Sequence, residues 1–314
     1  MKPTHPQIFI TDIGGFKLKL LNWANRFSIF CFLDNNGYPS QNKEFDYLLA
    51  AGATRNLHLT AENPFQQLKD FFNEKPGWLF GHLGYDLKNS LENLVTRHPP
   101  FINFGIGYFF EPEIIVKVSG NKVQVIGNKN ARQVVDEILN EKTENFQAKT
   151  NFSLEPVFNK QEYLLKLNQI KAHIQRGDCY EINFCQQFIA HNAGIDAIAT
   201  FHKLNSVSPN PFASLYKLNK KYCIAASPER FLKKTGNQLI SQPIKGTAKR
   251  NAQNCVLDNQ NKTALSDSQK ERSENVMVVD LVRNDLSRVC KAGSVTVKEL
   301  CGIYAFPQVF QMIS

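Results

Sequence analysis

Two short turns in the second half of the sequence carry ionisable side chains that could take part in chemistry. Lys245 stands in PIKGT (243–247), between a stiff proline and a flexible glycine, and Glu229 directly follows Ser227-Pro228. Proline interrupts strand pairing, which lets the next side chain be re-aimed. A lysine amine can act as a nucleophile and a carboxyl group as a general acid. Because Pro-x-Lys-Gly is also a common surface turn, these residues alone leave Lys245 as either a catalytic amine or an ordinary turn residue.

A further acidic side chain precedes an apolar segment. The run VMVVDLV (276–282) is apolar on nearly all sides, which predicts a buried helix. A carboxylate on a buried helix must be paired or must bind a cation, because its desolvation is costly. For Glu274 both interpretations remain open. For Asp280 we favour a local ion pair with Arg283 or Arg288.

The elements that must position these residues are predicted from hydrophobic periodicity. Apolar residues at helical spacing predict a helix that ends at Gly177; they are Leu164, Leu167, Ile170 and Ile174. Over residues 180–185 apolar and polar residues alternate, which predicts a strand whose polar face carries Glu181 and Asn183. Asn183 is then either a site residue or an exposed strand residue.

Other segments have the signals of short strands joined by turns. The predicted strands lie at 27–32, 114–126 (a hairpin turning at Gly120-Asn121), 222–226, 230–233 and 238–242. A helix is expected over 131–139, and Ser268 with Glu271 has capping-box spacing at the start of another. Alternating strands with flanking helices favour an α+β fold.

A polar stretch near the middle of the chain predicts a division into two domains. The segment EKTENFQAKTNF (141–152) follows the expected helix and is typical of a linker. We therefore place a boundary near Thr150, which gives an amino-terminal domain of residues 1–150 and a second domain of residues 151–314.

Composition narrows the class of protein. The 314 residues contain 37 Lys+Arg and 28 Asp+Glu, a net charge of +9, and 42% are hydrophobic, which is ample for a packed core. The basic residues are dispersed, so we expect no nucleic-acid partner and no membrane surface. Neither a spanning segment nor a secretory signal is predicted, which favours a cytoplasmic protein. The 7 cysteines contain no C-x-x-C pair and are predicted to be small apolar residues.

Six motifs, in a consistent order, resemble those of the chorismate-utilising enzymes, the family of anthranilate synthase component I. They are GWLFGHLGYD (77–86), IQRGDCYEIN (174–183), SPNPF (208–212), SPERF (227–231), PIKGT (243–247) and SENVMVVDLVRNDL (273–286). The resemblance runs from about Gly77 to Ser314 and covers the preceding part more loosely. It implies an α+β sandwich of two large antiparallel sheets with helices outside.

Within that family, a lysine in the PIKGT position implies the aminodeoxychorismate synthase group, where anthranilate synthases and isochorismate-type enzymes usually carry alanine. By resemblance, the Lys245 amine attacks C2 of chorismate while Glu229 protonates the departing C4 hydroxyl. Ammonia then adds at C4 and expels the lysine. Glu274 would be a ligand of the Mg2+ that holds the ring carboxylate of the substrate. The predicted substrate-binding residues are Thr247, Gly246, Asn183 and Glu181.

Two departures from the family pattern matter. The residue after Tyr180 is usually glutamine in amine-transferring enzymes and lysine in those that activate water, but here it is Glu181. In addition, the sequence stops before the family's GSITGAPK motif, so we expect a chain truncated at its carboxyl terminus, with an incomplete catalytic domain.

The resemblance also implies partners for the predicted reaction. No G-x-C-x-G glutaminase motif is present, so ammonia is expected from a separate glutamine amidotransferase subunit. The product would be 4-amino-4-deoxychorismate, the precursor of para-aminobenzoate in folate biosynthesis. Two alternatives remain: anthranilate synthase component I of tryptophan biosynthesis, or an inactive fragment that only binds a ligand or partner.

Overall fold

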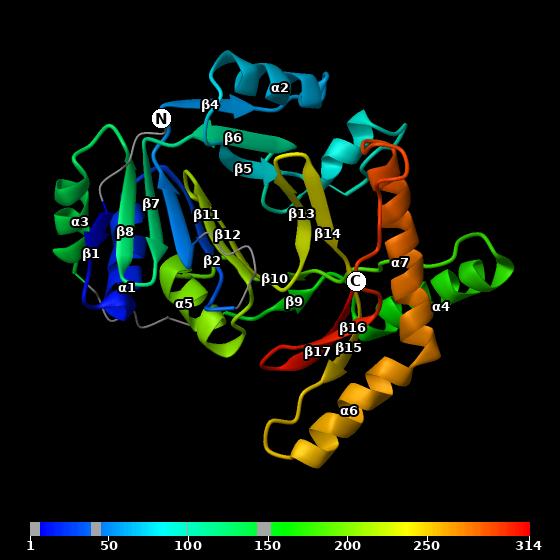
Figure 1. The fold of residues 1–314 in the computed structure, drawn as a ribbon. Helices are drawn as coiled ribbons and strands as arrows, with labels where there is room; N and C mark the ends of the chain where they lie inside the picture. The colour runs from blue at the N-terminus through cyan, green and yellow to red at the C-terminus, as the bar shows by residue number, and fades with distance from the viewer. Residues whose placement is uncertain (1–6, 39–44, 99, 143–151) are drawn as a thin grey trace. The chain divides into compact units, whose positions relative to one another are not determined.

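The computed structural model of the protein describes residues 7–38, 45–98, 100–142 and 152–314, and its helices and antiparallel sheets give an α+β fold (Figure 1). The chain divides into two compact units, residues 1–144 with 201–314 and residues 145–200. The predicted boundary near Thr150 falls in residues 143–151, which lie outside the described residues.

The largest sheet of the first unit has seven strands among the described residues, and neighbouring strands are antiparallel throughout. In spatial order they are β1 (Gln7–Phe9), β8 (Lys122–Gly127), β7 (Ile114–Ser119), β3 (Tyr47–Ala51), β2 (Ile29–Asp34), β11 (Phe212–Leu218) and β12 (Lys221–Ser227). Strand β3 is buried along its whole length, as expected for a central strand covered on both faces. The structure confirms the strand predicted near 27–32 and the hairpin over 114–126, which turns at Gly120.

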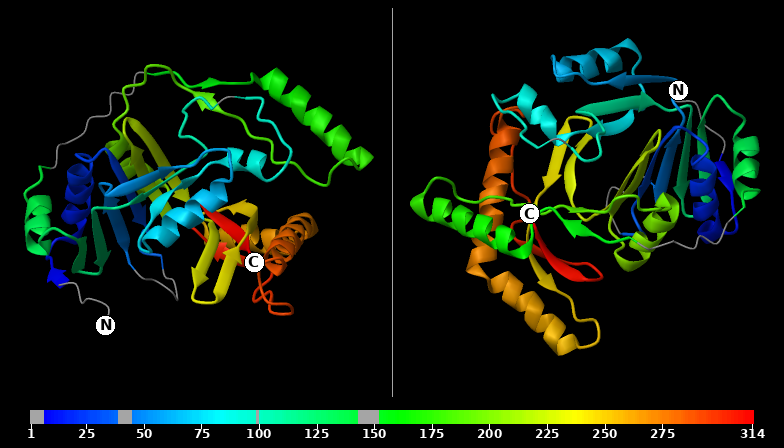
Figure 2. Two further views of the ribbon diagram at one scale, coloured as in Figure 1. Left: turned by 90° about the horizontal axis from the view of Figure 1, so that it is seen from above. Right: turned by 180° about the vertical axis from the view of Figure 1, so that it is seen from behind.

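Helices α1 (Ile13–Ala24) and α3 (Ala131–Leu139) lie side by side next to this sheet (Figures 1 and 2). Helix α3 has the predicted limits, and its N-cap residue Asn130 accepts hydrogen bonds from the backbone of the first turn. The indole of Trp23 donates a hydrogen bond of 3.2 Å to Glu137 and so joins the two helices. Their apolar faces are buried through Phe16, Leu20, Leu21, Val134, Val135 and Ile138.

A second, three-stranded sheet shares the core of the large one. It consists of β4 (Arg55–His58), β6 (Gly107–Glu111) and β5 (Phe80–Leu83), and it is accompanied by α2 (Pro64–Glu74) and the 3-10 helix η1 (Tyr85–Ser90). One apolar cluster contains side chains of both sheets, among them Phe80, Tyr108, Phe110, Leu48 and Tyr216. Two sheets that face each other across a core, with helices outside, agree with the predicted sandwich.

The carboxyl-terminal elements carry the candidate site. The hairpin of β13 (Arg230–Thr235) and β14 (Gln238–Gln242) is followed by a sheet of β15 (Ile244–Lys249), β17 (Val309–Ile313) and β16 (Gly302–Ala305). Helices α6 (Cys255–Asp267) and α7 (Gln269–Ser287) pack against β15. The strands predicted at 222–226, 230–233 and 238–242 are confirmed as β12, β13 and β14.

The second unit holds one predicted helix and lacks one predicted strand. Helix α4 (Lys160–Arg176) ends at Gly177, which adopts a left-handed φ of 84°, as the sequence predicts. The strand predicted over 180–185 is wrong, because that segment is irregular and the short strand β10 (Phe188–Ile189) follows it instead, paired with β9 (Glu155–Pro156). Within the described residues, 180–185 has no strand partner, and alternation without a partner does not make a strand. Helix α5 (Ala197–Val207) leads back into the first unit.

The prediction that the helix around residues 276–282 is buried is also wrong. Helix α7 does begin after its predicted cap, with Ser268 accepting a hydrogen bond from Glu271 N at 3.3 Å. However, Val276 is 45% exposed and Leu281 is 58% exposed. Among the described residues α7 packs mainly on β15, so one face of it stays open, and its buried residue is the polar Asn275. No helix in the described part of the chain is long and apolar enough to cross a membrane.

Candidate active site

Lys245 lies on an irregular part of strand β15. The pairing with β17 shifts by one residue between Ile244 and Thr247, so β15 carries an extra residue there, a β-bulge. Gly246 occupies the bulge with a φ of 101°, a conformation that residues with a side chain rarely adopt. Lys245 itself is half-buried. The bulge therefore gives Lys245 an orientation that a regular ladder would not give it.

Glu229 approaches the same bulge from the turn before β13. Its carboxylate Oε1 accepts a hydrogen bond of 3.3 Å from the backbone N–H of Ile244, the residue directly before Lys245. The Ser227 hydroxyl accepts a bond of 3.2 Å from the Glu229 N–H, which fixes the Ser-Pro-Glu turn. Glu229 is exposed, so its carboxyl group can reach a ligand lying over the bulge. Two residues that the sequence places apart are thus neighbours.

The residue after Glu229 anchors the turn from its other side. The Arg230 guanidinium lies 4.7 Å from the centre of the Phe212 ring, and its Nε donates a hydrogen bond of 3.1 Å to Gln242. Burial lowers the pKa of Arg230 from its usual value. The side chain is thus engaged with Phe212 and Gln242, and it supports the position of Glu229.

Thr247 and Gly246 follow Lys245 on the same strand. The Thr247 hydroxyl donates a hydrogen bond of 2.9 Å to Oε1 of Gln311 on β17. Sequence reasoning missed Gln311, because nothing in its neighbourhood indicates which strand lies opposite Thr247. The structure brings together four of the predicted site residues, namely Lys245, Glu229, Gly246 and Thr247.

Sequence reasoning also missed Asn275, the residue after Glu274. Its side chain is buried at 1% exposure and donates a hydrogen bond of 3.1 Å to the backbone carbonyl of Lys245. The available signal was a single amide at the start of an otherwise apolar helical run.

Glu274 lies on α7 with its carboxylate partly exposed. It pairs with Lys270 one turn earlier at 3.4 Å, and Lys270 also pairs with Glu271 at 3.2 Å. Glu271 and then Glu274 raise the pKa of Lys270. Glu274 was interpreted either as a member of an ion pair or as a metal ligand. The structure shows the ion pair, with Lys270 as the partner. The predicted local ion pair of Asp280 is confirmed, with Arg283 at 2.7 Å.

Glu274 also has the chemistry of a magnesium ligand. Mg2+ in proteins is usually held by one or two carboxylates together with substrate oxygens and water. Glu271 and Glu274, both within reach of one ammonium group, fit that pattern. Among the described residues there is no group of three or more His, Cys, Asp or Glu side chains that could hold a metal ion. Any ion here would depend on substrate or water for its remaining ligands.

Asn183 and Glu181 belong to the second unit. Asn183 is exposed and Glu181 is half-buried, both on the irregular segment after α4. Nearby, Phe184 stacks on Tyr163 at a centroid distance of 5.1 Å and on Phe158 at 6.1 Å, which holds the segment against α4. The assignment of Asn183 and Glu181 as substrate-binding residues stays a prediction.

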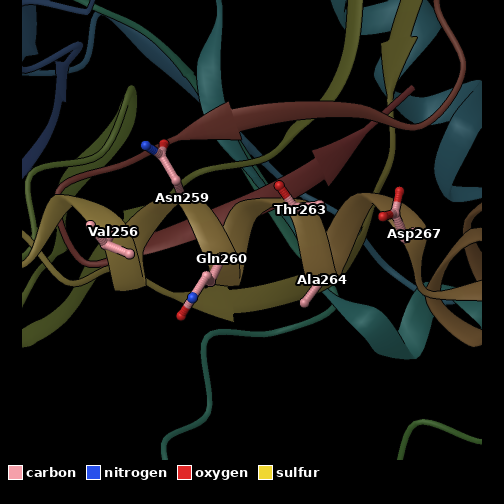
Figure 3. A pocket seen from close by; sticks show the side chains of 6 residues that line it. All are labelled: Val256, Asn259, Gln260, Thr263, Ala264 and Asp267. Carbon is pink, nitrogen blue, oxygen red and sulfur yellow. The ribbon is translucent and has the colours of Figure 1, made fainter.

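Of two hollows in the first unit, one lies next to this site. A depression of ≈ 590 Å³ follows the outer face of α6 and is lined by Val256, Asn259, Gln260, Thr263, Ala264 and Asp267 (Figure 3). It contains none of the predicted site residues. A smaller pocket of ≈ 170 Å³ is lined partly by Pro228 and Gln311, the neighbours of Glu229 and Thr247. The smaller pocket thus adjoins the candidate site.

Known proteins are similar to this chain in sequence. The family model described as chorismate binding enzyme matches residues 32–314. Aminodeoxychorismate synthase component 1 of Escherichia coli (strain K12) is 31% identical over 247 residues, which cover 76% of this chain and 53% of that protein. The protein of the same name from Klebsiella aerogenes is 38% identical over 156 residues, covering 50% of this chain and 34% of that one. The chain thus spans about a third to a half of the length of these relatives.

A solved structure has a similar fold. Anthranilate synthase component I from Streptococcus pneumoniae TIGR4 superposes with a TM-score of 0.73 at 18% sequence identity, covering 88% of this chain and 70% of that one. At that identity the likeness concerns the fold alone.

Proposed function

From the premise that this chain belongs to the family of chorismate binding enzymes, we propose that it belongs to an aminodeoxychorismate synthase component I. The proposed reaction replaces the C4 hydroxyl of chorismate by an amino group from ammonia and releases water. The observation that carries the proposal is the hydrogen bond between the Glu229 carboxylate and the backbone N–H of Ile244, the residue directly before Lys245. The two sequence relatives are both aminodeoxychorismate synthase component 1 proteins, which supports the same reaction.

The two side chains have complementary roles in this proposal. The neutral Lys245 amine adds to C2 of the ring, the ring double bond shifts, and the C4–O bond breaks. Glu229 gives its proton to the departing hydroxyl, because a hydroxyl leaves poorly without a general acid. Ammonia then adds at C4, the double bond shifts back, and the Lys245 amine leaves. Covalent addition divides one difficult displacement into two easier ones.

The other predicted residues would hold the substrate during these steps. Thr247 lies beside the bulge, and its hydroxyl would turn from Gln311 to donate a hydrogen bond to a substrate carboxylate, with Gly246 allowing close approach to the backbone. Asn183 and Glu181 are proposed as further substrate contacts. When bound at Glu274, Mg2+ would neutralise charge on the ring carboxylate. We further propose that ammonia comes from a separate glutamine amidotransferase subunit, in keeping with the word component in the relatives' names.

Turnover of chorismate by Lys245 variants tests the proposal. The protein is incubated with chorismate, ammonium and Mg2+, and the product is identified by mass. We expect aminodeoxychorismate from the parent protein. We expect a loss of at least about 100-fold in Lys245→Ala, the usual contribution of a positioned catalytic group. Lys249→Ala is the matched control, because Lys249 is an exposed lysine on the same strand.

Three outcomes would contradict parts of the proposal. Unchanged turnover in Lys245→Ala removes the covalent role of the lysine. Anthranilate as the product assigns the protein to the pyruvate-eliminating branch. No turnover by the parent, together with no calorimetric binding of chorismate and Mg2+, supports the inactive fragment.

A further inference from the structure

The Lys245 peptide group lies in the bulge of β15. In a regular antiparallel ladder each inward-facing carbonyl bonds to the neighbouring strand. Between the pairs Ile244–Ile313 and Thr247–Gln311 the register shifts, so the extra residue disrupts that ladder. Buried backbone carbonyls in native proteins are hydrogen-bonded. The Lys245 carbonyl accepts a hydrogen bond from a side chain outside the sheet.

The partner is the side chain of Asn275 on α7. Its Nδ2 donates one hydrogen bond of 3.1 Å to the Lys245 carbonyl and another of 3.2 Å to the carbonyl of Met312 on β17. Its Oδ1 accepts from the Ser314 hydroxyl at 2.5 Å and from the Cys301 thiol at 3.7 Å. The amide thus uses both donor hydrogens and its acceptor oxygen. A buried amide with every group bonded is held in one orientation.

The Lys245 segment is therefore held on both sides. Glu229 accepts a hydrogen bond from the Ile244 N–H, and Asn275 donates one to the Lys245 carbonyl. We propose that Asn275 is a positioning residue, whose amide holds the bulge so that the Lys245 amine stays directed at the site beside Glu229. The assignment rests on the proposed function in so far as Lys245 acts there as the nucleophile. Asn275 itself does not touch the substrate in this proposal.

A purely structural role is the competing explanation, in which Asn275 only fixes α7 to the sheet. The two differ in what they predict for Lys245 in the folded protein. If Asn275 merely adds stability, its removal lowers the unfolding midpoint but leaves the Lys245 amine as it was. If it positions the bulge, the chemical reactivity of that one amine changes while the fold persists.

Site-resolved lysine labelling distinguishes these roles. Parent protein and Asn275→Ala are labelled briefly with an amine-reactive acetylating reagent over a range of pH, and modification is quantified by peptide mass spectrometry. Lys249, exposed on the same strand, is the internal reference. We expect the Lys245 to Lys249 ratio in Asn275→Ala to move by about fivefold toward that of the urea-unfolded chain, the scale of one lost hydrogen bond.

The matched control is Asn254→Ala, the same substitution at the N-cap of α6. The Asn254 side chain accepts a hydrogen bond of 3.0 Å from Leu257 N, so its removal also costs stability, but it does not bond to β15. We expect an unchanged Lys245 to Lys249 ratio in this control. An equal ratio in Asn275→Ala and the parent would overturn the proposal, and so would an equal shift in both variants.

A second variant covers the case in which Asn275→Ala does not fold. Asn275→Asp keeps the size of the side chain and the acceptor for Ser314 but removes the amide donors, so we expect the same direction of change in the labelling ratio. A parent-like ratio in a folded Asn275→Asp also overturns the proposal. Labelling needs no turnover, so its result is independent of the proposed function, which is tested separately by turnover of chorismate and by the identity of the product.

Discussion

At the scale of single residues, Gly246 occupies a position that does not accommodate a side chain without strain. Its φ of 101° lies in a region that residues with a side chain rarely adopt. A Cβ at this position would lie 3.2 Å from Oε2 of Glu271 and 3.3 Å from Cβ of Met312. Helix α7 and strand β17 therefore both lie close against this glycine, and the bulge next to Lys245 depends on the missing side chain.

We predict that Gly246→Ala destabilises the protein by about 1–3 kcal/mol, since strained backbone and close contact add together. The measurement is the free energy of unfolding in urea. Gly77→Ala is the matched control, because nothing lies within 4 Å of a Cβ there, and its effect should stay within about 0.5 kcal/mol. Equal unfolding free energies for the two variants would contradict this account of the bulge.

At the scale of elements, features set by neighbouring residues were predicted correctly from the sequence. Features that depend on distant parts of the chain were not. Helix α3 begins after its N-cap residue Asn130, and helix α4 ends at its C-cap residue Gly177. Both limits are set by residues next to the helix in the sequence. The segment around Asn183 alternates like a strand, yet a strand needs a partner elsewhere in the chain. Likewise, the apolar run 276–282 predicted burial, which depends on what packs against the helix.

The candidate site shows the same division. Lys245, Glu229 and Thr247 were found from short motifs, because turn residues around them are local features. Their association was not visible, since it depends on a register shift between two strands and on the amide of Asn275, which is 30 residues away from Lys245. A bulge leaves no clear pattern in the sequence beyond one glycine.

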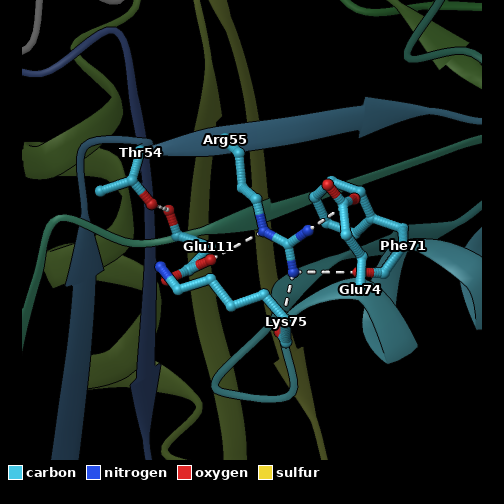
Figure 4. A network of polar contacts seen from close by, with 6 residues as sticks. All are labelled: Thr54, Arg55, Phe71, Glu74, Lys75 and Glu111. Atoms are coloured by element: carbon cyan, nitrogen blue, oxygen red, sulfur yellow. Dashed lines mark hydrogen bonds and ion pairs between the residues drawn. The ribbon is translucent and has the colours of Figure 1, made fainter.

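The end of helix α2 is held against its sheet by a charged side chain, and the helix does not end at a glycine cap. Arg55 on β4 donates hydrogen bonds from Nη2 to the carbonyls of Phe71 and Lys75 at the end of α2, at 2.9 and 2.8 Å (Figure 4). Its Nε bonds to Glu111 on β6 at 2.8 Å, and Lys75 bonds to the other oxygen of Glu111 at 2.6 Å. Arg55 thus satisfies carbonyls that a helix end leaves open.

This network predicts a pH dependence. Lys75 and then Arg55 lower the pKa of Glu111 from its usual value of 4.5. A carboxyl group whose pKa is lowered by folding adds stability above its unfolded pKa, and this is lost as the pH falls through the folded value. We therefore expect Glu111→Gln to be less stable than the parent at pH 7, and the difference to shrink below about pH 4.5. Urea unfolding of both proteins from pH 7 to pH 3.5 measures this, and a difference independent of pH would refute it.

At the scale of the whole molecule, the large sheet takes strands from distant parts of the chain. Strand β2 lies between β3 and β11, and β11 in turn pairs with β12. Residues of β11, including Ala213, Leu215 and Leu218, belong to the buried core. Without them β2 would become an exposed edge with open hydrogen-bonding groups.

We predict that residues 1–150 expressed alone are insoluble or lack stable structure, because that fragment has β2 without β11. Solubility and far-UV circular dichroism test this. Co-expression with residues 151–314 is the control and is expected to restore solubility. A soluble, cooperatively folding 1–150 fragment would instead support an independent amino-terminal domain with its boundary near Thr150.

The pairing of β2 with β11 also has a consequence for synthesis of the protein. Asp34 pairs with Ala213, so roughly 180 residues must be translated after β2 before its partner exists. At a synthesis rate of about 5–20 residues per second this interval is on the order of ten to forty seconds. During that time the apolar strand β2 leaves the ribosome with one edge open, and this edge could pair with strands of other chains.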